Sequence, residues 1–165
     1  MEEYDDEQDE RITDLLRSQP EHALDLAKDL VARFPTTGRS WQRLAHAYDA
    51  KKMHADALLA IKKAIEIDRE EPAYQFNISR LHMRVGAFCN AVETLSRCID
   101  TSVRLQNDYY LEACYLYRAY CHLRIGHLAD AEQDLERVTD DATVWMNGLI
   151  GKLEILEACR QHRRI

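Results

Sequence analysis

The feature that most constrains the fold is a set of small and apolar residues that recur at one fixed interval along the chain. Ala23, Ala57 and Ala91 are equally spaced, and so are the residues four and seven positions after each of them. A period of roughly 34 residues, as found here, is typical of helix–turn–helix repeats. One helix pair cannot bury its apolar face alone, whereas stacked pairs can. The recurrence therefore predicts a repeat protein built from helices.

The spacing of apolar residues in the rest of the chain is also helical. With 5 Gly and 3 Pro among 165 residues, the chain has few residues that favour long loops. No long window alternates apolar and polar residues as a β-strand does. We therefore predict an all-α fold, with helices over residues 12–19, 21–34, 39–51, 54–68, 72–85, 87–105, 108–126 and 127–139.

The recurrence delimits three full repeats and a partial one. The most regular repeat begins at residue 37 or 38 and ends at 71, and in it Trp41 and Tyr48 are expected to fill the space between helix pairs. The second repeat covers 72–105, and the third covers 112–139 and begins later than a strict period would place it. The N-terminal stretch keeps Ala23 and Pro35 but lacks the first-helix pattern. We interpret it as a degenerate half-repeat.

Two segments lie outside the regular spacing. Residues 141–163 carry an apolar stripe that starts at Trp145, and we expect one capping helix there. The six extra residues before the third repeat fall within Ile99–Leu111. We expect them to lengthen the two adjacent helices, either as a packed pair or as an additional contact or oligomer surface. Residues 11–165 are thus predicted to form a single domain.

Residues 38–71 resemble the tetratricopeptide repeat (TPR) family. The residues that match the family pattern are Trp41, Leu44, Tyr48, Ala57 and Ala64. The sequence departs from the pattern at Arg69, where the family has proline. The resemblance implies a right-handed α-solenoid of about three helix–turn–helix repeats, with the degenerate half-repeat before them and the capping helix after them.

The acidic residues are concentrated at the N-terminus. Seven of the 29 acidic residues lie within residues 1–10, so the rest of the chain has 22 acidic residues and 22 Lys and Arg residues. A block of like charge is usually a solvated, disordered end, and we predict an acidic disordered tail over 1–10. The alternatives are that the carboxylates fold over arginines of the repeats or recruit a basic partner.

Composition argues for a cytoplasmic protein. No apolar run approaches the roughly 20 residues that cross a bilayer, so no membrane contact is expected. The acidic N-terminus is unlike a secretory signal. The odd number of cysteines, 5, favours reduced thiols.

No pattern in the chain indicates catalysis, a cofactor or a metal. The set Cys114, Cys121, His122 and His127 has a spacing that fits no common zinc pattern. Adjacent helical residues such as Cys121 and His122 point in different directions, which does not suit a nucleophile and its base. No phosphate-binding loop is present, and the basic C-terminal residues are too few to indicate nucleic-acid binding. We expect a protein that is not an enzyme.

The resemblance to TPR proteins implies a concave groove lined by the first helix of each pair. Arginine and aromatic side chains at these positions are the types enriched at interfaces. The resemblance therefore implies that another protein or a peptide binds there, and an acidic segment is one alternative. The candidate partner-binding residues are Arg39, Gln42, Arg43, His46, Phe76, Asn77, Arg80, Met83, Arg84, Tyr117, Tyr120 and Arg124.

The resulting hypothesis is a protein–protein interaction module that acts as an adaptor, a scaffold or a small chaperone. Some family members bind the C-terminal carboxylate of a heat-shock chaperone with two Lys, two Asn and an Arg. Of the five corresponding positions only Asn77 matches, so we do not expect that clamp. The alternatives are a bacterial immunity protein that blocks a toxin, and a structural subunit of a homodimer or a larger assembly.

Overall fold

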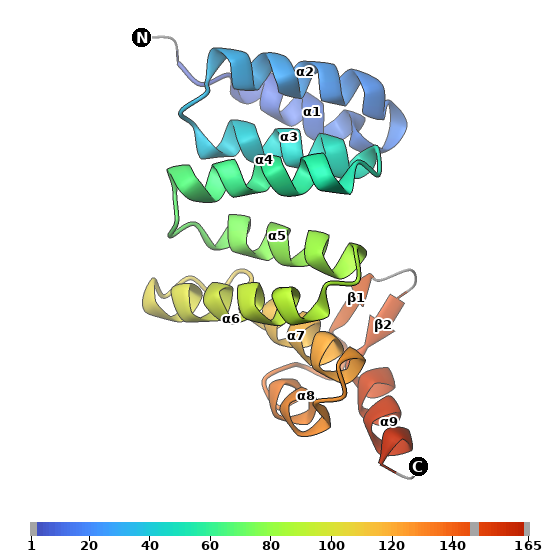
Figure 1. The fold of residues 1–165 in the computed structure, drawn as a ribbon. Helices are drawn as coiled ribbons and strands as arrows, with labels where there is room; N and C mark the ends of the chain where they lie inside the picture. Colours follow the sequence, from blue (N-terminus) through green and yellow to red (C-terminus); the bar gives the residue numbers. More distant parts are fainter. Residues whose placement is uncertain (1–2, 146–148, 164–165) are drawn as a thin grey trace. The chain divides into compact units, whose positions relative to one another are not determined.

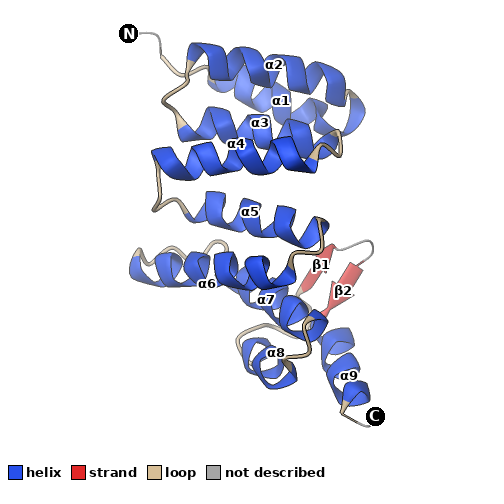
Figure 2. Ribbon diagram, in the orientation of Figure 1, coloured by secondary structure: helices blue, strands red, loops and turns tan. Residues whose placement is uncertain are grey.

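A computed structural model describes residues 3–145 and 149–163, without the side chains of residues 144, 145 and 149. Within these residues the chain forms helices α1 to α9 and one short hairpin, β1–β2 (Figures 1 and 2). The chain divides into two compact units, Met1–Tyr74 and Gln75–Ile165, which we call the N-terminal and C-terminal units. The prediction of an all-α repeat fold is confirmed.

The N-terminal unit contains two successive helix pairs. They are formed by α1 (Asp6–Ser18) with α2 (Pro20–Arg33) and by α3 (Gly38–Ala50) with α4 (His54–Ile67). Besides the contacts within each pair, α3 packs against both α1 and α2. Helix α5 (Pro72–Arg84) begins at the end of this unit. The degenerate half-repeat is therefore a complete helix pair in three dimensions.

Small side chains let the helices of this unit approach closely. Ala45, Ala57, Ile61 and Ala64 are all buried, as their spacing predicts. Gly38 lies at the start of α3, where an added Cβ would stand only 2.8 Å from the ring of Tyr74. The prediction that Trp41 and Tyr48 fill the space between helix pairs holds only in part. Trp41 is half-buried, and its indole N–H donates to the Pro35 carbonyl at 2.8 Å.

The acidic N-terminal segment differs from the predicted disordered tail. Helix α1 begins at Asp6, so residues 6–10 are helical. Asp5 caps the helix, because its carboxylate accepts the backbone N–H of Gln8 at 2.9 Å. Acidic residues in a first turn also interact favourably with the helix dipole. Residues 1 and 2 of the predicted tail lie outside the described residues.

The C-terminal unit contains most of α5, then α6 (Phe88–Arg104), α7 (Leu111–Arg124) and α8 (Leu128–Leu135). Strands β1 (Thr143–Trp145) and β2 (Leu149–Gly151) follow, and then α9 (Lys152–His162). Helix α7 is central to this unit, since it packs against α6, α8, α9 and β1. Leu116 of α7 and the side chains of Leu95, Cys98, Leu135 and Ile155 from the neighbouring helices belong to this core, and all are nearly or fully buried.

The inserted residues lengthen one helix and form a loop. Helix α6 has 17 residues and is longer than α2 and α4, with 14 each. Helix α7 has 14 residues and exceeds the other first helices, α3 and α5 with 13 each, by one residue, so the predicted lengthening of this helix is slight. The loop residues Tyr109 and Tyr110 behave differently. Tyr109 is 81% exposed, whereas the Tyr110 ring packs on Phe76 with centroids 4.8 Å apart.

The predicted capping helix over 141–163 is only partly correct. Its first part is an antiparallel strand pair in which Thr143 is opposite Gly151, and α9 begins at Lys152. Glu154 accepts the backbone N–H of Gly151 at 3.0 Å, which fixes the helix start after the hairpin. Residues 146–148 and the side chain of Trp145 lie outside the described residues. Helix α9 buries Ile155 and Cys159, whereas Leu153 of the predicted stripe is 63% exposed.

Candidate functional site

The N-terminal unit contains a buried carboxylate that binds two of the predicted partner-binding arginines. Asp9 on α1 has a fully buried side chain. Arg43 donates to it through Nε and Nη2, both at 2.8 Å, and Arg39 donates through Nη2 at 2.7 Å. The Tyr4 hydroxyl donates to the same carboxylate at 2.8 Å. Arg39 also pairs with Asp6 at 2.8 Å.

Two opposing effects set the pKa of Asp9. Burial raises this pKa, but the hydrogen bonds from Arg43 and Tyr4 and the charges of Arg43 and Arg39 lower it by more. The net pKa lies below the usual range for Asp, so the group is ionised at neutral pH. The arginines at these two groove positions therefore already neutralise a carboxylate of their own chain.

Sequence reasoning treated Asp9 as part of a solvated tail and missed this network. A signal for it was present, because the separation between Asp9 and Arg43 is 34, one repeat length. The two residues thus occupy equivalent positions in consecutive repeats, and equivalent helices of consecutive repeats are neighbours in a stacked array. One alternative to a disordered tail is that its carboxylates fold over arginines of the repeats. This alternative is correct for Asp6 and Asp9.

The other predicted groove residues differ in how much surface they offer. Four of them belong to the protein interior, and these are Gln42, Phe76, Met83 and Tyr117. Phe76 packs edge-on against Tyr117, with ring centroids 5.5 Å apart in the C-terminal unit. His46, Asn77 and Arg80 are half-buried, and Arg84 is exposed. Whether any of these residues binds a partner remains a prediction.

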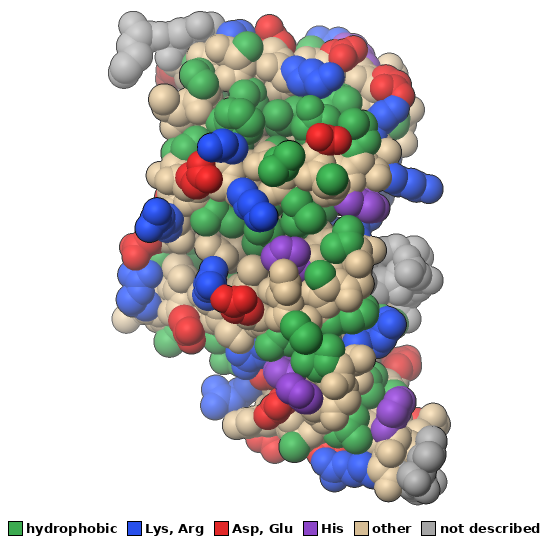
Figure 3. Space-filling model, in the orientation of Figure 1, with side chains coloured by type: hydrophobic (Ala, Val, Ile, Leu, Met, Phe, Trp, Pro, Cys, Tyr) green, Lys and Arg blue, Asp and Glu red, His purple; other side chains and the backbone are tan. Residues whose placement is uncertain are grey.

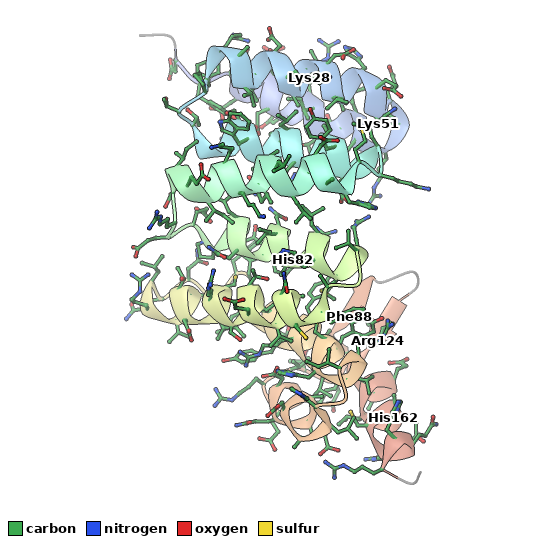
Figure 4. The ribbon with its side chains drawn as sticks, viewed as in Figure 1. Lys28, Lys51, His82, Phe88, Arg124 and His162 are labelled. Atoms are coloured by element: carbon green, nitrogen blue, oxygen red, sulfur yellow. The ribbon has the colours of Figure 1, made fainter. Side chains whose placement is uncertain are left out.

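Three aromatic and basic side chains form a surface cluster in the C-terminal unit. Phe88 begins α6, while Tyr120 and Arg124 lie in the last turns of α7. The Arg124 guanidinium lies 4.5 Å from the centre of the Phe88 ring, and its Nη1 donates to the Tyr120 hydroxyl at 2.8 Å. Figure 4 shows Phe88 and Arg124 close together where these helices meet. We call these three residues the Phe88 patch.

The Phe88 patch lies in an apolar part of the surface. Figure 3 shows hydrophobic side chains gathered where α6 begins and α7 ends. Val85, just before α6, is 47% exposed, and Arg124 is exposed as well. The cation–π contact and the hydrogen bond hold the guanidinium in place on this surface. An arginine held between aromatic rings is a typical element of a protein interface.

A polar pocket lies between α6, α7 and α8. Its volume is about 450 Å³, and Arg118 is one of the residues that line it. Arg118 donates to both carboxylate oxygens of Asp134, at 2.6 and 2.8 Å, and to the Ser96 hydroxyl at 2.9 Å. The hydrogen bond and charge of Asp134 raise the pKa of Arg118. The residues that line the pocket are Val92, Ser96, Tyr115, Arg118, His122, Asp130, Gln133, Asp134 and Arg137.

Two histidines and a carboxylate meet at the edge of this pocket. Gly126 adopts a left-handed conformation, with φ 81°, and brings His127 back over the end of α7. The rings of His122 and His127 stack with centroids 5.8 Å apart, and His127 Nδ1 lies 3.6 Å from an Asp130 oxygen. Burial lowers the pKa of His122, although Asp134 and Asp130 oppose this effect. The ring of His122 is therefore neutral at pH 7.

The buried cysteines Cys98, Cys114 and Cys121 are placed for packing rather than for catalysis. Cys114 donates to the sulfur of Cys98 at 3.3 Å, and both side chains are fully buried. This hydrogen bond, together with burial, raises the pKa of Cys114. Burial raises the pKa of Cys121 to about 12. Such thiols are not ionised at neutral pH, so they are poor nucleophiles.

The hydropathy of the helices adds one further observation. Within residues 3–145 and 149–163, no helix has the length and apolar character needed to cross a membrane.

Comparison with known proteins identifies the repeat. Residues 38–71 match the family model described as the tetratricopeptide repeat. This is the stretch on which the sequence resemblance rests, so the predicted TPR resemblance of these residues is confirmed. No curated protein sequence is significantly similar to the chain.

Solved structures with TPR folds are similar to this chain over most of its length. A kinesin light chain protein with TPR-like repeats from Podosopora anserina aligns with a TM-score of 0.70 and 21% identity, over 79% of this chain and 71% of that one. MamA aligns with a TM-score of 0.68 and 13% identity, over 95% and 77% of the two chains. The first TPR domain of Spaghetti (RPAP3), bound to an HSP90 peptide, aligns with a TM-score of 0.65 and 15% identity, over 78% and 94%. At these identities the comparison establishes the helical-repeat fold.

Proposed function

We propose that the chain is a non-enzymatic protein-interaction module that binds a segment of another protein. The repeat at residues 38–71 supports this proposal, because repeat proteins of this kind offer extended binding surfaces. Two similar structures are complexes: the RPAP3 domain is bound to an HSP90 peptide, and the TPR2B domain of yeast Sti1 is in a complex with pHsp70. The adaptor, scaffold and chaperone roles are narrower forms of the same proposal.

The observation that carries the proposal is the Phe88 patch. Its guanidinium is exposed and held in place by Phe88 and Tyr120, so little side-chain entropy is lost when a partner binds. The exposed Val85 extends the patch with apolar surface. This chemistry suits a partner segment with an apolar side chain next to a carboxylate. We propose that Arg124 binds the carboxylate and that the aromatic rings contact the apolar group.

The preference for an acidic segment rests on Arg124 in this proposal, and not on the arginines of α3. Arg39 and Arg43 donate to Asp9, so a partner carboxylate would have to displace a buried one. The carboxylate clamp described for some family members is not part of the proposal either. Its positions are occupied here by Gln42, His46, Asn77, Ala113 and Tyr117, and only Asn77 is of the required type.

A matched pair of charge reversals tests the proposal. The wild-type protein, Arg124→Glu and Arg11→Glu are used to capture partners from the native cell, and the affinity for each captured protein is then measured by calorimetry. Arg11 is exposed on α1, so its reversal changes the net charge equally without touching the patch. We expect Arg124→Glu to weaken binding by at least about tenfold, as for an interface hot spot, and Arg11→Glu to leave it unchanged.

Equal recovery and equal affinity for all three proteins would refute the Phe88 patch as the binding surface. Circular dichroism of both variants shows that a loss of binding is not a loss of fold.

Light scattering of the free protein and the identity of the captured partner separate the alternative functions. A stable homodimer would favour the structural-subunit hypothesis, whereas a captured toxin whose activity is blocked would favour an immunity protein. The cytoplasm remains the compartment that we propose, because the odd number of cysteines, 5, favours reduced thiols.

A further inference from the structure

The turn between α7 and α8 brings together side chains of the types that bind transition metals. One ligand atom from each of His122, His127 and Asp130 lies within 4.8 Å of the other two. The three residues come from the last turn of α7, the cap of α8 and the first turn of α8. Figure 3 shows histidine and acidic side chains next to each other over these two helices.

One nitrogen in this cluster has no protein partner. The Nδ1 atom of His122 is buried and makes no hydrogen bond, and the side chain as a whole is only 12% exposed. A buried polar atom without a partner costs free energy, so such atoms are rare unless a ligand or a water satisfies them. The other ring nitrogen, Nε2, lies 3.9 Å from an oxygen of Asp134. The lone pair of Nδ1 is thus not used by any protein donor, while a carboxylate lies near Nε2.

We propose that His122, His127 and Asp130 form a binding site for a divalent transition-metal ion, with Zn²⁺ the best match. Two imidazoles and one carboxylate are a ligand set that Zn²⁺ accepts, and a water completes the tetrahedron. Asp134 lies 3.9 Å from Nε2, and a slight approach would make it the outer partner that orients His122, an arrangement typical of histidine ligands. Because Arg118 holds Asp134 by two hydrogen bonds, this outer partner is itself fixed.

The cluster needs only a local adjustment to bind an ion. Ligands about 2.0–2.1 Å from a tetrahedral Zn²⁺ stand about 3.3 Å apart, so the atoms of the cluster must converge by about 1.5 Å at most. His127 and Asp130 can make this adjustment by side-chain rotation, because their side chains are 58% and 56% exposed. His122, the buried member, provides the fixed point.

The same positions in the other repeats lack the ligand set. With Ala131 aligned on Ala91, the three ligand positions are occupied in the second repeat by His82, Ala87 and Asn90. With Ala131 aligned on Ala57, they are occupied in the first repeat by Tyr48, Met53 and Asp56. The site is therefore specific to the third repeat. The second repeat also shows that a turn of this kind folds with Ala and Asn in place of His127 and Asp130.

This internal comparison supplies the test. Zn²⁺ binding to the full chain, without any affinity tag, is measured by isothermal titration calorimetry in a Cys89→Ser background, because Cys89 is an exposed thiol. The test variant is His127→Ala with Asp130→Asn, which reproduces the residue types of the second repeat. The control variant is His162→Ala, which removes an exposed histidine outside the cluster.

We expect one Zn²⁺ to bind per chain and the test variant to lose at least about tenfold in affinity, with the control unchanged. Saturating Zn²⁺ should raise the melting temperature of the parent protein by about 5 °C or more and leave that of the test variant unchanged. Co²⁺ should give the intense visible absorption of a tetrahedral site in the parent alone. Equal affinity of the parent and the test variant, or no saturable binding by the parent, would overturn the proposal.

Discussion

The first and third full repeats place opposite chemistry at equivalent positions. Leu44 on α3 and Ala60 on α4 are buried apolar residues, only 6% and 3% exposed. The residues that correspond to them in the third repeat are Arg118 on α7 and Asp134 on α8, which form an ion pair with two hydrogen bonds. Each pair of helices nevertheless forms the same helix–turn–helix unit.

The difference shows that an ion pair is not required to hold such a repeat together. Moving two charges out of water costs free energy that their attraction only just offsets, so an apolar pair at the same positions is at least as stable. The third repeat instead gains a polar pocket, and the ion pair holds Asp134 next to His122. We infer that the charges at these positions serve a site rather than the fold.

The largest expected effect comes from breaking this ion pair on one side. Asp134→Ala leaves the Arg118 charge with a side chain only 20% exposed and without its carboxylate. We expect a loss of about 3–5 kcal/mol in unfolding free energy, measured by chemical denaturation. The double change Arg118→Leu with Asp134→Ala copies the first repeat and should be within about 1 kcal/mol of the wild type or more stable than it.

The double variant decides between the two interpretations of the comparison. If the double variant is as unstable as Asp134→Ala, the third repeat needs the ion pair for its stability. An apolar pair like Leu44 and Ala60 would then not stabilise the third repeat as it does the first. Arg118→Leu alone should also be unstable, because it leaves the buried Asp134 carboxylate without a donor.

The ion pair of the N-terminal unit joins two repeats rather than two helices of one repeat. Asp9 on α1 is fully buried, and removing it leaves Arg43 with an 18% exposed side chain and no carboxylate. We expect Asp9→Ala to lose about 3 kcal/mol. Asp6→Ala is the matched control, since Asp6 pairs with Arg39 from a side chain that is 70% exposed. We expect it to lose less than about 0.5 kcal/mol, and similar losses for both variants would contradict the importance of burial.

The pKa of Asp9 makes the same comparison sensitive to pH. Its pKa is lower in the folded protein than in the unfolded chain, for which the usual value is about 3.9. The carboxylate therefore stabilises the fold fully above that value, and this contribution is lost as the pH falls through the folded pKa. We expect the urea midpoints of the wild type and Asp9→Asn to differ at pH 6 and to converge towards pH 2. A constant difference across this range would contradict the assignment.

These contacts show which parts of the molecule the sequence could predict. The small residues Ala57 and Ala64 predicted close helix packing because their spacing matches a repeat that recurs along the chain. The Asp9 network was missed because charge composition is averaged over a segment, whereas burial depends on the side of the helix on which one residue lies. Extending the repeat register to the N-terminus would have placed Asp9 next to Arg43.

The candidate site was predicted less well than the fold. Family positions placed Phe76, Met83 and Tyr117 in a groove, but a position in a repeat does not determine whether a bulky side chain packs inward. Phe88 was not among the predicted site residues, because these were taken from the first helix of each pair and Phe88 begins a second helix. Its contact with Arg124 is distant in sequence and is seen only in the folded structure. His122 and His127 were considered as metal ligands together with Cys114 and Cys121, and that set was rejected because its spacing fits no common zinc pattern. The fold instead brings the two histidines together with Asp130, which was not considered from the sequence.

The smallest expected effect concerns the turns, where the repeats again differ at one equivalent position. Lys52, Gly86 and Gly126 occupy the same place in the turns of the three full repeats, and all have positive φ, at 59°, 75° and 81°. A Cβ on either glycine would meet no atom within 4 Å, so a substitution there costs only backbone strain. We expect Gly86→Ala and Gly126→Ala to lose about 1 kcal/mol each.

Lys52→Gly tests the opposite direction. Glycine relieves the strain of the left-handed conformation but makes the unfolded chain more flexible, so we expect a gain of no more than about 0.5 kcal/mol. Denaturation of the three single variants side by side measures both the backbone strain and the entropy of the unfolded chain. The strain is the loss in unfolding free energy on Gly→Ala, and the entropy is the amount by which the gain on Lys52→Gly falls below that loss. A loss on Lys52→Gly as large as that on Gly86→Ala would mean that the lysine side chain stabilises its turn, and the three turns would then not be equivalent.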